Sequence, residues 1–197
     1  MQIEEHLKRV EELAAQLSEQ QRALFCLACA ERLAGCCWAF ARGRAVPLAP
    51  FFDWMEQLAL AAATDSWGTL DLLAASAELD AVVPMSDDDG SPLAIQAQAG
   101  VICLLSAIAA LQGAHSACRD SAMGVIDAID NYVMRMHEHV FGNLSGPDDS
   151  LLMDRELALQ LSDLSFLRTL EQPPGNIAAW RERNLQFAIP IAFGPAS

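Results

Sequence analysis

The segment from Ser18 to Phe40 is the feature that most constrains the fold. It has the length of a long helix, and beyond Arg22 its only charged residues are the neighbours Glu31 and Arg32. A helix that is apolar on nearly every side has no face to turn to water, so other helices have to surround it. The segment therefore predicts the central helix of a bundle.

The composition favours helices throughout the chain. Of the 197 residues, 53% are hydrophobic, and alanine and leucine supply most of them, whereas β-branched and aromatic residues are scarce. That bias favours helices over strands. A chain of this length is the size of one domain and buries roughly 70% of its unfolded surface. We expect an all-α fold, built as a single-domain bundle.

Local signals place the individual helices. Apolar residues at helical spacing predict a helix over Ile3–Leu17. Ser18 followed by Gln21 fits a capping box that opens the central helix, and Ser91-Pro92 is a start signal, a cap with proline at the first helical position. The remaining expected helices are Pro50–Ala63, Thr69–Val82, Ser91–Gln112, Ser116–Phe141, Ser150–Leu170 and Asn176–Phe187. The sequence thus predicts seven or eight helices in one domain, 1–187, and an uncharged tail, 188–197.

The charges are distributed unevenly. The 74 residues from Ala45 to Cys118 contain no lysine or arginine, and the whole net charge of −14 lies beyond Arg44. The acids of this run are Asp53, Glu56, Asp65, Asp71, Glu78, Asp80, Asp87, Asp88 and Asp89. A one-sided field of this kind attracts cationic partners and repels nucleic acid and anionic lipid.

A partner-binding surface is predicted within this run. Asp71 and Glu78 are seven residues apart, so they share one helix face. A solvated face usually pairs charges of both signs at i,i+4, and here no basic residue is present. A solvated acidic face is the ordinary interpretation, and the missing bases shift it toward an interaction surface; both interpretations stay open. The expected residues of that surface are Asp65, Asp71, Glu78, Asp80, Asp87, Asp88 and Asp89, with Trp67 as an aromatic anchor.

One stretch raises the question of a membrane. Residues 90–118 carry no Asp, Glu, Lys or Arg, which is long enough to span a bilayer. Gln96, Gln98 and Gly100 interrupt it, so we favour a buried helix. Glu4 and Glu5 stand where a secretory signal needs basic residues. We expect a cytoplasmic protein without membrane contact.

The cysteines are expected to be buried thiols. Cys26 and Cys29 form a C-x-x-C, but a reactive pair of this type sits at a helix N-terminus, and Cys26 lies well inside the predicted helix. A zinc site needs four converging ligands, whereas the four cysteines at 26, 29, 36 and 37 point in several directions from one helix. Free cysteines are among the most buried residues.

Metal binding by other residues is also disfavoured. His137 and His139 are two positions apart on a helix and point about 200° apart. Asp87 to Asp89 do not complete a calcium loop, because the twelfth position is Gln98 instead of glutamate. We expect no metal and no cofactor.

Glu31 and Arg32 are the charged pair of the central helix. Buried ionised groups need partners to offset their lost hydration, so the pair predicts a structural salt bridge to another helix. The alternative is a small-molecule site between helices. Because no recognised nucleophile, phosphate-loop or metalloprotease motif is present, we expect no catalytic residues and no enzyme activity.

Three segments resemble the YjaG-like family, a bacterial domain of unknown function. They are Gln20–Phe40 with its Cys29-Ala30-Glu31-Arg32-Leu33 stretch, Phe51–Leu111 with Val83-Pro84 before the acids, and Ala158–Glu171. The acidic residue usual in the family's long fifth helix has no counterpart here. The resemblance implies an all-helical bundle and a cytoplasmic location, and it implies no activity.

Together these features lead to one functional hypothesis and two alternatives. An acidic helical protein with no catalytic set is suited to covering a basic partner, since nuclease surfaces are basic and association is steered by charge. The hypothesis is an immunity protein, the antidote to a basic bacterial toxin such as a nuclease. The alternatives are a housekeeping protein that binds a small ligand near Glu31 and Arg32, and a structural homo-oligomer joined through the tail.

Overall fold

A computed structural model describes residues 3–44, 47–84, 91–136, 149–170 and 174–191. Over these ranges the chain forms eight α-helices and one short 3-10 helix, with no strand. The predicted all-α fold is confirmed. The helices are α1 (Ile3–Ala14), α2 (Glu19–Arg44), α3 (Ala49–Thr64), η1 (Trp67–Thr69), α4 (Leu72–Asp80), α6 (Pro92–Leu111), α7 (Ala117–Met136), α8 (Asp149–Thr169) and α9 (Pro174–Leu185).

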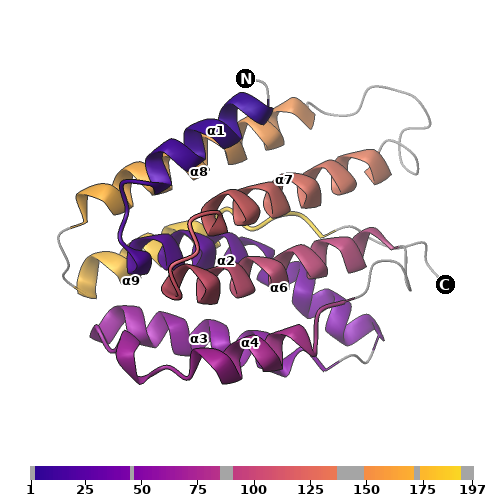
Figure 1. Ribbon diagram of the computed structural model, residues 1–197. Helices are drawn as coiled ribbons and strands as arrows, with labels where there is room; N and C mark the ends of the chain where they lie inside the picture. The colour runs from indigo at the N-terminus through magenta and orange to yellow at the C-terminus, as the bar shows by residue number, and fades with distance from the viewer. Residues whose placement is uncertain (1–2, 45–46, 85–90, 137–148, 171–173, 192–197) are drawn as a thin grey trace.

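Helix α2 lies at the centre of the bundle, as predicted. Its most extensive contacts are with α6, and it also contacts α3, α7, α8 and α9. The residues from Arg22 to Leu33 are all buried, including both charged residues of the pair. In Figure 1 the other helices pass on both sides of α2. Because neighbours cover this part of α2 all round, its uniform apolarity has a structural explanation.

The α2–α6 contact is unusually close at one glycine. A Cβ atom added to Gly100 of α6 would lie 2.5 Å from Cys37 Sγ and 3.3 Å from Leu33 Cβ, both on α2. No side chain fits in that space without movement of its neighbours. Gly100 therefore sets how near the two central helices approach.

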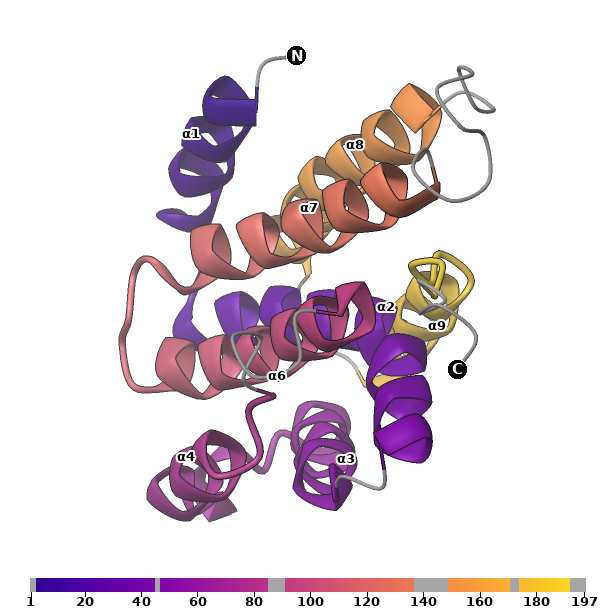
Figure 2. The same cartoon turned by 90° about the vertical axis from the view of Figure 1, so that its right-hand side faces the viewer.

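The remaining helices form two groups on either side of this centre. Figure 2 shows α3 and α4 together on one side of α6, with α1, α7 and α8 on the other. The contacts agree, since α1 packs on α7 and α8, and α4 packs on α6. Helix α9 contacts both α2 and α3. We call α3, η1 and α4, residues 49–80, the outer layer.

The helix starts follow the predicted caps. The Ser18 amide donates to Gln21 Oε1 at 2.9 Å, and the Gln21 amide donates to Ser18 Oγ at 3.2 Å, a complete capping box. Ser91 Oγ accepts from the Ala94 amide at 3.1 Å. The helix predicted from Thr69 begins later, at Leu72, because Asp71 caps it by accepting from the Ala74 amide.

The start of the expected tail belongs to the domain. Ile189 is buried, and its amide donates to the Arg32 carbonyl at 2.9 Å. The Gln96 side chain donates from Nε2 to the Pro190 carbonyl at 2.9 Å. This segment therefore crosses α2 and α6, and the domain extends past the predicted boundary at residue 187. Residues 192–197 lie outside the described part.

Two helices have the length and composition of a membrane span. They are α2 and α6, and neighbouring elements bury 78% and 67% of their most apolar windows. The core helix of a soluble protein meets the same criteria. The uncharged stretch after residue 90 thus forms α6 and packs between α2 and α7, as the sequence favoured.

Candidate functional site

The predicted acidic surface lies mainly on the outer layer. Asp65 is exposed and ends α3 in the left-handed conformation, with φ 53°. Asp71 is exposed and caps α4, and Asp80 is the exposed last residue of that helix. Glu78 is exposed, yet it accepts a hydrogen bond from Trp54 Nε1 at 2.8 Å. The structure thus brings these four carboxylates onto two adjoining helices, two of them with local structural roles.

The other predicted surface residues have different outcomes. Trp67 was expected as an exposed anchor, but its exposed fraction is only 9% and it packs in the hydrophobic core. The reason is that η1 packs against α3, so its tryptophan joins the core. Asp87, Asp88 and Asp89 lie outside the described residues, as do His137 and His139.

The outer layer has further exposed residues that the sequence did not single out as sites. Asp53 and Glu56 add two carboxylates on α3. Leu60 and Leu73 are exposed by 63% and 78%, large values for leucine. Their exposure could not be read from the sequence, because periodicity alone does not say which apolar residues a neighbouring helix covers. The outer layer therefore combines negative charge with apolar contact area.

A buried ion network joins α2 to α8 and α9. The Arg32 guanidinium contacts Glu156 and Asp163 of α8, each at 3.0 Å, and all three side chains are at most 3% exposed. Asp163 also accepts from Trp180 Nε1 at 3.0 Å and from Arg183, both on α9. The predicted interhelix salt bridge is confirmed for Arg32. The Asp163 carboxylate of α8 thus binds side chains of both α2 and α9.

Glu31 makes a separate pair on the next face of α2. Its Oε1 accepts from Arg181 Nε of α9 at 2.5 Å, while Oε2 has no hydrogen-bond partner within the described residues. Arg181 also lies 4.0 Å from the exposed Glu56 of α3. Both members of the charged pair on α2 therefore bind the C-terminal helices, in confirmation of the structural reading.

The network continues to the N-terminal helix through an amide. Gln160 Nε2 donates to Glu156 Oε1 at 3.0 Å, and its Oε1 lies 2.7 Å from His6 Nε2. Glu156, Gln160 and Asp163 follow helical spacing, so they share one face of α8. This spacing of polar residues was visible in the sequence and marks a polar face on α8, but it does not indicate that Arg32 packs there.

The pKa values of the network follow from burial and charge. Burial raises the pKa of Glu156 and of Asp163, and Arg32 opposes that rise in both. Burial raises the pKa of Glu31, with Arg181 acting against it. For Arg32, burial alone would lower the pKa, but Glu156, Cys29 and Asp163 raise it above its ordinary value. The guanidinium is therefore the fixed charge around which the carboxylates are held.

The cysteines are buried thiols, as expected. All six are free and buried. Burial raises the pKa of Cys36 to about 12, and it raises the pKa of Cys26 and Cys29 well above the ordinary thiol value. A buried thiol with a raised pKa is a poor nucleophile. Among the described residues no three His, Cys, Asp or Glu side chains gather as metal ligands.

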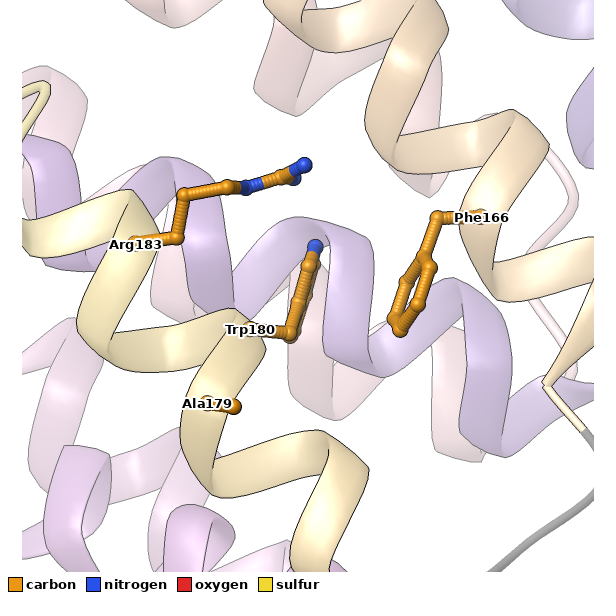
Figure 3. Close-up of a pocket in the computed structure, with 4 residues that line it drawn as sticks. All are labelled: Phe166, Ala179, Trp180 and Arg183. Carbon is orange, nitrogen blue, oxygen red and sulfur yellow. The ribbon is translucent and has the colours of Figure 1, made fainter.

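A pocket of about 250 Å³ lies beside the network, between α8 and α9. It is lined by Phe166, Ala179, Trp180 and Arg183. Figure 3 shows the Phe166 and Trp180 rings facing each other, with Arg183 reaching toward the nitrogen edge of the indole. The ring centroids are 6.1 Å apart and the ring planes differ by 17°. Sequence reasoning did not predict this pocket, because its residues come from two segments.

Comparison with known proteins gives one informative match. No protein-family model matches the sequence, and no curated protein matches it significantly. A solved structure of a DUF416 family protein from Shewanella baltica OS155 superimposes with a TM-score of 0.68 at 16% identity. The match covers 91% of this chain and 93% of that one. The YjaG-like, that is DUF416, resemblance seen in the sequence is thus confirmed in the fold.

Proposed function

We propose that this protein is a cytoplasmic binding protein, not an enzyme, and that its outer layer docks a basic protein partner. The observation that carries the proposal is the charge of that layer. Every acid of residues 49–80 is exposed, and no basic residue occurs there to neutralise it. Arg181 lies 4.0 Å from Glu56 of this layer, but Glu31 already engages it.

The layer also offers the apolar contact that a stable interface needs. Charge speeds and orients association, whereas affinity comes mostly from buried apolar and aromatic groups. Leu60 on α3 and Leu73 on α4 are exposed and can supply such contacts. Trp67 does not contribute, because it is buried in the core. The more specific version of the proposal is an antidote that covers the phosphate-binding surface of a toxic nuclease.

The first test is capture of the partner from the native cell lysate, with elution at low and at high salt. A basic, stoichiometric, salt-sensitive partner is expected. A second copy of the chain as the captured protein would instead support the homo-oligomer alternative.

Surface variants then locate the interface. Asp53→Lys with Asp80→Lys reverses two exposed carboxylates of the outer layer that accept no hydrogen bond from another described residue. Glu5→Lys with Asp154→Lys makes the same change of net charge on α1 and α8. Because steering depends on local charge, the first pair is expected to weaken binding and flatten its salt dependence more than the second. Equal losses from both pairs would reject the outer layer as the interface.

A further inference from the structure

The pocket between α8 and α9 differs from a simple packing gap. Phe166 is half-buried and Trp180 is 3% exposed, so aromatic side chains line the pocket and its base is well packed. Its volume of about 250 Å³ is below the range of pockets for drug-sized ligands. A ligand that fills it is therefore small. The two rings stack on each other and leave no slot between them, but apart from Arg183 the lining is apolar, which suits an aromatic ring.

The accessible charge in this pocket is positive. Asp163 and Glu156 are fully covered, and the donors of Arg32, Trp180 and Arg183 occupy them. Arg183 is the member of the Arg32–Asp163 network that reaches solvent, with 38% of its side chain exposed. A ligand approaching from outside meets the guanidinium and no carboxylate of the network. That arrangement selects an anion.

One donor of this guanidinium has no partner. Arg183 donates from Nη2 to Asp163, but its Nε is buried without a hydrogen-bond partner in the described part of the chain. A buried donor left unpaired is destabilising. That atom is also shielded from solvent, so a ligand meets the exposed part of the guanidinium, for which a carboxylate is the natural acceptor.

We propose that this pocket is a binding site for a single-ring aromatic carboxylate. The ligand ring lies against Phe166 beside Trp180, and its carboxylate accepts from the exposed part of Arg183. Asp163 holds Arg183 in place from below, so the cation is positioned before the ligand arrives. The site is separate from the outer layer and does not depend on the proposed docking of a protein there.

The test uses benzoate, 4-hydroxybenzoate, 4-aminobenzoate and nicotinate as probes, with benzamide as the neutral counterpart of benzoate. The chain has four tryptophans, so a ¹H–¹⁵N spectrum contains four indole signals, and a Trp180→Phe variant assigns the one in the pocket. At least one carboxylate is expected to shift the Trp180 signal saturably, and benzamide to bind about tenfold more weakly, the loss of one charge-assisted hydrogen bond.

Variants separate this site from general binding. Arg183→Gln is expected to weaken the carboxylate about tenfold or more, while Asp163 keeps Arg32 and Trp180 as donors. Arg168→Gln on the exposed surface of α8 is the matched control and is expected to change nothing. Arg183→Lys keeps the positive charge but lacks the paired N–H donors of a guanidinium. It replaces Arg183→Gln if that variant fails to fold.

Three results would overturn the proposal. The first is the absence of a saturable shift with all four carboxylates. The second is equal binding of benzamide and benzoate. The third is a loss on Arg168→Gln as large as that on the Arg183 variants.

Discussion

Replacement of Arg32 by methionine is the most informative perturbation of this fold. The guanidinium is fully buried and neutralises Glu156 and Asp163, which are themselves buried. Methionine has a similar length and fits an apolar core, so the change removes the charge more than the volume. It leaves one remaining cation, the half-exposed Arg183, against two buried carboxylates.

The expected cost is large. Removal of one partner from a buried ion pair costs about 3–5 kcal/mol, and for a chain of this size each kcal/mol lowers the melting temperature by about 2–4 °C. The variant is therefore expected to lose on the order of 10 °C. Arg9→Met is the matched control, because Arg9 pairs with Glu12 on the exposed face of α1. Its expected cost is below about 1 kcal/mol.

The loss is also expected to depend on pH. Burial raises the pKa of Glu156 and Asp163, and Arg32 opposes that rise, so both pKa values rise further in the variant. A carboxyl whose folded pKa is raised contributes stability that is complete below its unfolded pKa and is lost as pH rises through the folded pKa. The deficit of Arg32→Met should therefore be greater at about pH 7 than at about pH 5.

Urea unfolding of the wild type and both variants at the two pH values measures these quantities. A deficit for Arg32→Met no larger than that for Arg9→Met would refute the reasoning that Arg32 is a buried structural charge. A deficit that is the same at both pH values would show that the two carboxyls do not take up protons when Arg32 is removed.

Three further predictions concern the rest of the bundle. Burial lowers the pKa of His6 below 6.5, so the contribution of His6 to stability is complete above that pH and declines below it. In His6→Gln the free energy of unfolding in urea should therefore change less between about pH 7 and pH 5 than in the wild type. Gly100→Ala is expected to lower the free energy of unfolding by about 1–2 kcal/mol, which is the cost of overpacking minus the gain in helix propensity. The cost should be smaller in a Cys37→Ala background, and a double-mutant cycle measures that difference. The six cysteines should react with a thiol reagent only on unfolding, because they are buried; rapid labelling of the folded protein would contradict their burial.

The sequence was sufficient for features that depend on neighbouring residues. The capping box at Ser18 and the start at Ser91-Pro92 are both local, and both occur as predicted. The central place of α2 also followed, because a helix without a polar face admits one kind of position. The buried state of Glu31 and Arg32 followed from the same argument.

The sequence could not supply the partners of these charges. Arg32 and Asp163 are 131 residues apart, and any of several acids was a chemically valid partner. Only the fold selects among them. The same holds for the pocket, because Phe166 and Trp180 face each other through the packing of α9 on α8 and not through a motif. Trp67 was misjudged because a turn between helices carries no periodicity that indicates which way its side chain points.

The segment at Ile189 and Pro190 has a consequence for the order in which the protein is made. It closes over α2 through the Arg32 carbonyl and over α6 through Gln96. A ribosome releases α2 long before this segment and before α6 to α9, the helices that cover its apolar sides. During synthesis the central helix is therefore exposed before most of its covering neighbours exist, a state prone to aggregation. We expect the nascent chain to need a chaperone until its last helix has emerged.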